Sequence, residues 1–278
     1  MDSMLTIASH RWEVQVDPAH GANLACARYR GRDVLCPRSA GRDNPYLAGA
    51  PLLLPANRTA GGRFSFAGKT YALPVNEPSS GAHLHGELHR QCFRVRRREV
   101  NCVQLEYENV GTIYPFPFLI QVAYRVDDNC LHAGYRIYNP SDAAMPVTFA
   151  LHTTFEEPEW FRVPLAACQE RDARNLPTGR LVPLSAQELS YTTGSPSRGR
   201  VISGYYRSAG DTAQIGPHFR YQAFGFDHWI LFNGGGTSGL LCVEPQLGAV
   251  NALNDPENCP TISGKSSLNL QTRLFWVP

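Results

Sequence analysis

Long hydrophobic runs are missing from this 278-residue sequence. No stretch approaches the roughly 20 consecutive apolar residues that a membrane-spanning helix needs. The first residues, MDSMLTIASHRWEVQV, also lack the charged segment followed by an apolar segment that marks a secretory signal. We therefore expect a soluble, cytoplasmic protein with no membrane partner.

A strong excess of charge of one sign is missing too. The sequence has 26 Lys and Arg against 24 Asp and Glu, a formal net charge of +2. Its one basic run, RVRRREV from Arg94, is typical of the solvated side of a strand rather than of a track for phosphate groups. Nucleic acid is therefore not an expected partner.

The cysteines lack the patterns of a metal site or a disulfide framework. None of the eight stands in a Cys-x-x-Cys pair, and most lie in apolar or alternating runs. Disulfide frameworks belong mainly to short secreted chains. We expect buried thiols.

The sequence also lacks the helical repeat of apolar residues. No window of ordinary helix length keeps a 3.6-residue repeat of apolar residues, whereas short alternating runs bounded by Gly, Pro, Asn or Asp recur. RFSFAGKTYAL predicts a hairpin with Ala67-Gly68-Lys69 as its turn, and Asp127-Asp128-Asn129 predicts the turn of a second. Further strands are expected in WEVQV, VQLEYEN, WILFN, GLLCVE and SLNLQTRLFWV. Strands from end to end, without a linker, predict one all-β domain over residues 1–278, a large antiparallel sandwich rather than a barrel.

The stretch GAHLHGELH places His83, His85, Glu87 and His89 at alternate positions. On an unbroken strand all four would share one face and could bind a metal, a polar ligand such as a sugar, or only water. A metal would need another ligand from a distant strand, and Glu87 follows the His-x-His pair too soon for a cupin-type site. No metal is expected.

Three other polar residues interrupt or follow apolar segments. Arg58 follows PLLLPAN, where a fixed guanidinium could donate to hydroxyls or a carboxylate. His152 lies within PVTFALHTTF, which otherwise has the character of strand core. Glu244 ends the run GLLCVE before Pro245, and partial burial there would raise its pKa towards that of a general base. Each has a structural alternative: a solvated loop arginine, a satisfied core histidine or a strand-end carboxylate facing water.

In order, five segments resemble the aldose 1-epimerase (galactose mutarotase-like) family, from about Asn44 to Asn254. They are GAPLLLPANRTAGGRFSFAGKTYAL, HLHG, YPFPFLIQVAYRV, NPSDAAMPVTFALHTTF and LLCVEPQLGAVNALN. The resemblance implies a large antiparallel β-sandwich, the galactose mutarotase-like supersandwich, with a sugar cleft on one sheet. It also implies an isomerase that interconverts the α and β anomers of a free aldose without cofactor or metal.

The resemblance assigns roles to residues at matching positions. Glu244 would be the general base for the C1 hydroxyl and His152 the general acid for the ring oxygen. The sugar would be held by Arg58, His85 and Asn57. These side chains are expected to line one pocket, with His83 and His89 as edge or loop residues outside it.

One element of the family is not clearly matched. An Asp that contacts sugar hydroxyls should fall roughly between residues 195 and 215, where the sequence reads RVISGYYRSAGDTAQIG. Asp211 and, beyond it, Asp227 of GFDHWILF are the candidates. Thr153-Thr154 also stands where the family usually has an aromatic residue. The preferred sugar therefore stays open.

Two other functions fit the same fold. One is an epimerase of a modified or phosphorylated sugar, which would need an extra basic cluster at the cleft, for which Arg63 and Lys69 are candidates. The other is a non-catalytic carbohydrate-binding or sensing protein. The expected partner is a small-molecule sugar, and the chain is expected to be a monomer or a homodimer.

Overall fold

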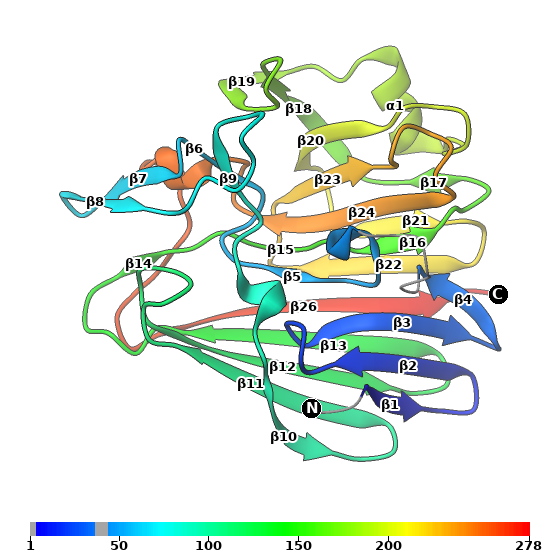
Figure 1. Ribbon diagram of the computed structural model, residues 1–278. Coiled ribbons are helices and arrows are strands. Elements are labelled where there is room, and N and C mark those ends of the chain that lie inside the picture. Colours follow the sequence, from blue (N-terminus) through cyan, green and yellow to red (C-terminus); the bar gives the residue numbers. More distant parts are fainter. Residues whose placement is uncertain (1–3, 37–43) are drawn as a thin grey trace.

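Two large antiparallel sheets dominate the computed structural model, which describes residues 4–36 and 44–278 (Figure 1). The larger sheet runs in the order β1-β2-β3-β4-β16-β24-β23-β20-β18-β19, and β15 joins it by pairing with both β24 and β5. Its strands are β1 (Leu5–Ala8), β2 (Trp12–Asp17), β3 (Asn23–Tyr29), β4 (Arg32–Leu35), β5 (Leu52–Leu53), β15 (Phe149–Leu151), β16 (Thr154–Glu156), β18 (Leu165–Arg171), β19 (Pro177–Val182), β20 (Ser203–Ser208), β23 (His228–Phe232) and β24 (Leu240–Leu247). We call it the twelve-stranded sheet.

The second sheet has eight strands in the order β10-β11-β12-β13-β26-β22-β21-β17. They are β10 (Arg94–Arg98), β11 (Cys102–Asn109), β12 (Phe118–Val126), β13 (Cys130–Tyr138), β17 (Phe161–Arg162), β21 (Thr212–Ile215), β22 (Phe219–Phe224) and β26 (Ser267–Trp276). Three two-stranded sheets complete the β structure: β6 (Arg58–Ala60) with β9 (Ala82–Leu84), β7 (Arg63–Phe66) with β8 (Lys69–Ala72), and β14 (Met145–Pro146) with β25 (Thr261–Ile262). The predicted all-β fold is thus confirmed.

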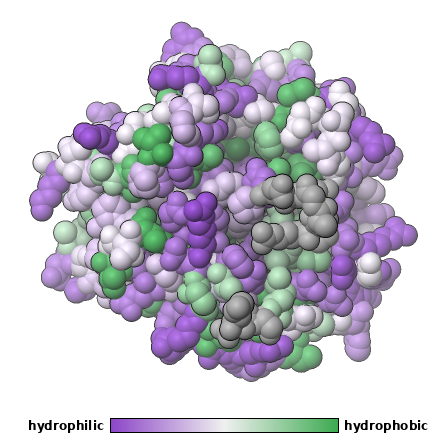
Figure 2. Space-filling view, viewed as in Figure 1, coloured by the Kyte–Doolittle hydropathy of each residue, from purple (hydrophilic) through white to green (hydrophobic). Residues whose placement is uncertain are grey.

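The core lies between the two large sheets. Each strand buries alternate residues, because successive side chains point to opposite faces. In β12 the exposed residues Gln121 and Arg125 alternate with the buried residues Phe118, Ile120, Val122, Tyr124 and Val126. The face shown in Figure 2 is mostly hydrophilic, with hydrophobic residues in small scattered groups. Four of the eight cysteines are buried, Cys92 is exposed, and three are half-buried, so the expected burial holds only in part.

Both predicted hairpins form. The first turns on Ala67 and Gly68 alone, which both have positive φ, and Lys69 already belongs to β8 opposite Phe66. In the second, the Asp127 carboxylate accepts hydrogen bonds from the backbone N–H groups of Asn129 and Cys130. These turns depend on neighbouring residues, and the sequence therefore predicts them well.

One α-helix was not predicted. Helix α1 (Ala186–Thr193) begins with a capping box, in which Ser185 and Glu188 bond each other's backbone N–H groups. This Ser-x-x-Glu spacing is visible in the sequence, but the helix has only eight residues and one buried side chain. The described residues also form the 3₁₀ segments η1 (Pro45–Leu47), η2 (Leu88–Arg90) and η3 (Ala252–Asn254). No helix in the described part of the chain is long and apolar enough to cross a membrane.

Strand β24 continues past Pro245, beyond the predicted strand GLLCVE. Pro245 lies opposite Trp229 of β23. On the other side of β24, the pairing passes from β16 to β15 at this point. The N–H of Val243, two residues earlier, bonds the carbonyl of Thr153. The missing N–H of Pro245 therefore points to the same side, where the ladder changes strands and needs no donor.

Strand β9 ends at a sharp break. His85 and Gly86 both have positive φ, 64° and 62°. The backbone of Gly86 approaches Leu54 so closely that a Cβ atom there would lie 2.0 Å from the Leu54 carbonyl oxygen. This break turns the chain, so that His85 and the residues after it do not share a strand face.

We expect Gly86→Ala to lower the free energy of unfolding by about 3 kcal/mol or more, because the left-handed backbone and the clash with Leu54 both oppose a side chain. Gly81→Ala is the matched control, since Gly81 has a φ of 67° but open space around it. It should cost only about 1 kcal/mol. Urea unfolding of both variants tests this, and equal losses would contradict the close approach at Gly86.

Candidate active site

A pocket of about 330 Å³ opens on the face of the twelve-stranded sheet that points away from the core. Strands β18, β20, β23 and β24 form its floor, and the β6–β9 sheet and η1 contribute to its walls. The residues that line it are Asn44, Tyr46, Leu47, Asn57, Arg58, Glu77, Leu84, His85, His152, Arg171, Asn175, Ser203, Tyr205, Ile230, Leu231, Phe232 and Glu244. The pocket therefore brings together Asn57, Arg58, His85, His152 and Glu244, which the sequence singled out.

His152 and Glu244 form a cross-strand pair. Strands β15 and β16 pair with β24 in one continuous register, so residue 152, which lies between them, is directly opposite residue 244. The two side chains point to the same face, and His152 Nε2 lies 3.5 Å from Glu244 Oε1. Only 7% and 3% of the two side chains are exposed. An acid and a base are thus held in contact in a nearly dry site.

Burial shifts the proton affinities of this pair in opposite directions. Desolvation lowers the pKa of His152 to about 4, because it disfavours the charged imidazolium. Desolvation also raises the pKa of Glu244 well above its ordinary value, and the positive charge of Arg58 opposes that rise. Both shifts favour the uncharged forms, a protonated carboxyl beside a neutral imidazole.

Arg58 is fixed by three neighbours. Its Nε and Nη2 atoms each donate to a carboxylate oxygen of Glu77 at 2.6 Å, and Nη1 donates to the Tyr205 hydroxyl at 2.6 Å. A weaker bond of 3.4 Å joins Nη1 to Asn57 Oδ1. Of its five N–H groups, one on Nη2 has no bond within the described residues and is available to a ligand.

His85 forms one wall beside the acid–base pair. Its backbone N–H bonds the Asn57 carbonyl, and its ring centroid lies 5.3 Å from that of His152. Burial, with the nearby His152 and Arg58, lowers its pKa well below the usual range. The ring is therefore a neutral imidazole. Tyr46 packs on His85 with ring centroids 4.5 Å apart and also lines the pocket; no sequence signal marked it.

The other two histidines of GAHLHGELH lie outside the pocket lining, as expected, but neither is a surface residue. His83 is fully buried, and its Nδ1 bonds the Pro74 carbonyl at 2.7 Å. His89 is buried in η2 against Tyr46, and desolvation lowers its pKa to about 4. His83 lies in the two-stranded β6–β9 sheet and His89 in a 3₁₀ segment, so they hold edge and loop positions although both are buried.

Asp227 does not line the pocket, and its expected role in sugar binding is therefore corrected. Its Oδ1 accepts a hydrogen bond of 2.8 Å from the Gly248 N–H and lies 2.9 Å from His228 Nδ1. It thus fixes the turn before β23. Asp211 is also outside the pocket and exposed.

In the sequence window where the acid was expected, the residues that line the pocket are Ser203 and Tyr205. The sequence analysis also missed Glu77 and Arg171, which come from a loop and from the end of β18. Their neighbours carry no distinctive motif. Arg63 and Lys69 are exposed on the β7–β8 hairpin and do not line the pocket.

Donor atoms grouped closely enough to hold a metal ion occur once in the described residues. They belong to His152, Cys242 and Glu244 and lie within 4.8 Å of one another. Such nitrogen, sulfur and oxygen donors would suit zinc. The pair His83 and His85 takes no part in this group, so the metal reading of the histidine-rich stretch finds no support.

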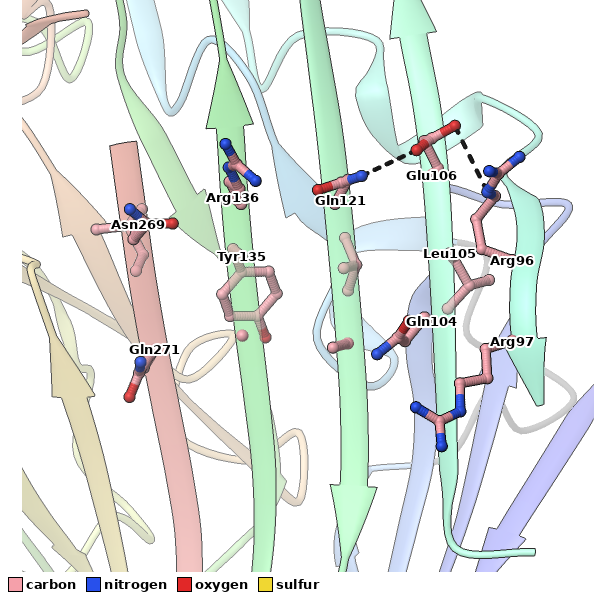
Figure 3. A pocket seen from close by; sticks show the side chains of 14 residues that line it. Arg96, Arg97, Gln104, Leu105, Glu106, Gln121, Tyr135, Arg136, Asn269 and Gln271 are labelled. Atoms are coloured by element: carbon pink, nitrogen blue, oxygen red, sulfur yellow. Dashed lines mark hydrogen bonds and ion pairs between the residues drawn. The ribbon is translucent and has the colours of Figure 1, made fainter. Parts of the chain in front are cut away.

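A second hollow lies on the outer face of the eight-stranded sheet, between β10, β11, β12, β13 and β26 (Figure 3). Its side chains are mostly polar, and three of them are bonded to one another: Glu106 accepts a hydrogen bond from Gln121 and forms an ion pair with Arg96. It holds no buried acid–base pair. The pocket of His152 and Glu244 is therefore the candidate active site.

Comparison with known proteins points the same way. The model of the family Aldose 1-epimerase matches residues 4–234, which include Arg58, His85 and His152 and stop short of Glu244. A protein of Escherichia coli K12, YihR, described only as uncharacterized, is 28% identical over 138 residues, which are 48% of this chain and 44% of that protein.

Three solved structures share the fold. A galactose mutarotase-like protein from Clostridium acetobutylicum has a TM-score of 0.90 at 19% identity, covering 99% of this chain and 95% of its own. An aldose epimerase homologue from C. elegans has a TM-score of 0.84 at 14% identity, covering 100% and 99%. A galactose 1-epimerase from Lactobacillus acidophilus has a TM-score of 0.79 at 14% identity, covering 99% and 94%. The family match over most of the sequence, on this fold, shows that the chain belongs to the aldose 1-epimerase family.

Proposed function

We propose that this protein is a mutarotase, a cofactor-independent isomerase that interconverts the α and β anomers of an aldose free at C1. The observation that supports this most is the buried cross-strand contact of His152 with Glu244, 3.5 Å between Nε2 and Oε1. Opening a cyclic hemiacetal needs one base and one acid that act together, and an imidazole–carboxyl pair supplies both.

In the proposed reaction, Glu244 takes the proton from the C1 hydroxyl while His152 gives a proton to the ring oxygen. The bond between C1 and the ring oxygen breaks, and the aldehyde rotates about C1–C2. Ring closure on the other face returns both protons. The reacting form is the arrangement in which the pair's one proton is on His152 and Glu244 is ionised. Ring opening moves the proton of the pair to Glu244, the arrangement that burial favours.

The walls of the pocket would orient the sugar. Arg58 has one free N–H for a sugar oxygen, and its charge opposes the rise in the pKa of Glu244. His85 and Asn57 offer neutral polar groups on the same side. These groups suit hydroxyl recognition, because a neutral imidazole and an amide both donate and accept hydrogen bonds.

Glu244→Gln should slow enzyme-dependent mutarotation roughly 10²- to 10⁴-fold, because the amide keeps the shape of the side chain but cannot take the C1 proton. Polarimetry of freshly dissolved α-glucose and α-galactose, corrected for the rate in buffer, provides the measurement. Glu170→Gln removes a carboxylate of the same sheet outside the pocket and should keep the full rate. Wild-type protein that binds sugar without accelerating the change would instead support a carbohydrate-binding protein.

The pH profile of kcat/KM should be bell-shaped, with its acid limb at about pH 4. Below that pH His152 also takes up a proton, so the pair holds two protons and has no base. The alkaline limb should lie well above pH 4.5, where Glu244 loses its proton and the pair has no acid. Initial rates across buffers of constant ionic strength measure this. An acid limb at pH 6.5, the ordinary pKa of histidine, would contradict the assignment.

A further inference from the structure

The candidate active site contains two guanidinium groups, and among the described residues only that of Arg58 has a counter-ion. Arg58 is bonded through two N–H groups to Glu77. Arg171, at the end of β18, donates from Nη1 to Ser203 Oγ at 3.0 Å and from Nη2 to the Ser203 carbonyl at 2.8 Å. Both of these acceptors are neutral. Its guanidinium also lies over the Tyr205 ring, 5.1 Å from the centroid.

The acidic residues next to Arg171 in the chain bond elsewhere. Glu170 accepts hydrogen bonds from Thr178 and forms an ion pair with Arg180. Asp172 forms an ion pair with Arg174. Within residues 4–36 and 44–278, the structure contains no ion pair between Arg171 and a carboxylate. The guanidinium therefore presents an uncompensated positive charge to the pocket.

The rest of the pocket lining does not neutralise this charge. The carboxylate of Glu77 is matched by Arg58. Glu244 is buried in contact with His152, with 3.5 Å between Oε1 and Nε2. Arg171 therefore leaves the described part of the pocket with a net positive charge, which a neutral sugar would leave unpaired and an anionic sugar would meet with charge-assisted hydrogen bonds.

The position of Arg171 suits the end of a sugar opposite to C1. Glu244 lies on β24 and Arg171 on β18, with β23 and β20 between them. Three strand spacings of about 4.8 Å separate the two strands by roughly 14 Å. The Arg171 side chain extends over β20, where it bonds Ser203 and lies over the Tyr205 ring, and the pocket continues across β23 to Glu244. A ring whose C1 is held at Glu244 thus directs its far end towards Arg171.

The acid expected at this place in the pocket is absent. Ser203 and Tyr205 are the lining residues in the expected window, and Ser203 is the residue that accepts the bonds of Arg171. A carboxylate at position 203 would have paired with Arg171 and made the pocket fit neutral hydroxyls. With serine there, the guanidinium keeps donors for a ligand.

We propose that the substrate is an aldose that carries an anionic group, a carboxylate or a phosphate, on the end away from C1, and that Arg171 determines this specificity. The proposal rests on the proposed mutarotase function. Arg171 would bind the anionic group and hold the ring with C1 at His152 and Glu244. The planar guanidinium can bind either a carboxylate or a phosphate through two N–H groups. The proposal therefore specifies a negative charge on the substrate and does not distinguish between the two groups.

The test is the ratio of kcat/KM for anionic sugars to that for neutral sugars. Glucuronate, galacturonate and glucose 6-phosphate are compared with glucose and galactose, each corrected for its own rate in buffer. Wild-type protein should favour at least one anionic sugar tenfold or more, and the better of the uronates and the phosphate identifies the group. Arg171→Gln should lower the ratio at least tenfold, mainly through KM, and Arg171→Lys, which keeps the charge without the fork, should fall between.

Arg207→Gln is the matched control. Arg207 lies on β20, two residues from Tyr205 and so on the same face, but it is exposed and does not line the pocket. It removes the same charge and should leave the ratio unchanged. Thermal unfolding of all three variants shows whether each is folded, and Arg171→Lys carries the test if Arg171→Gln is not.

The outcomes separate the two proposals. A wild-type preference for neutral sugars, or a ratio unaffected by Arg171→Gln, would overturn the anionic substrate and leave the mutarotase function standing. If wild-type protein accelerates no sugar, the mutarotase function fails. Calorimetric titration with glucuronate and glucose 6-phosphate then decides the role of Arg171: binding lost in Arg171→Gln supports anion recognition, and no binding by wild type refutes it.

Discussion

The register of β24 against β15 and β16 is the constraint on which the site depends. It places residue 152 opposite residue 244, and any shift by one residue would turn one of the two side chains towards the core. Pro245 fits into β24 because the strand paired with β24 changes from β16 to β15 beside it. His152 lies between those two strands. The site is thus a local interruption in a sheet that is otherwise regular.

Strand β24 also helps to exclude water from the pair of His152 and Glu244. Strand β24 is buried along most of its length, with Leu241 and Val243 in the core and Glu244 under the pocket. Burial on the face under the pocket lowers the pKa of His152 and raises that of Glu244. Electrostatics and topology are therefore linked: a pair on an exposed face would titrate near its ordinary pKa values.

Local features of the fold could be predicted from the sequence, and distant pairings could not. The hairpin turns at Ala67-Gly68 and at Asp127 follow from residues next to one another. Glu244 and His152 stood out as polar groups in apolar runs, but only the strand register shows that they meet. Asp227 was a candidate without a clear match to a motif, and it does not line the pocket, because its carboxylate accepts a hydrogen bond from the Gly248 backbone. No sequence pattern marked Arg171. Its importance depends on the absence of a carboxylate partner among the described residues around it, which only the structure shows.

One half of the pocket belongs to the twelve-stranded sheet, and the other half belongs to the small β6–β9 sheet. Arg58 and His85 come from the β6–β9 sheet and its edge. Each strand of this sheet has three residues, so the sheet cannot be stable alone. It is held in place by bonds such as Arg58 to Tyr205 and Ala60 to Asn251. A ligand that contacts both halves therefore acts as a tie between them. By mass action it lowers the population of any form in which the small sheet has come loose, so occupancy and local order rise together.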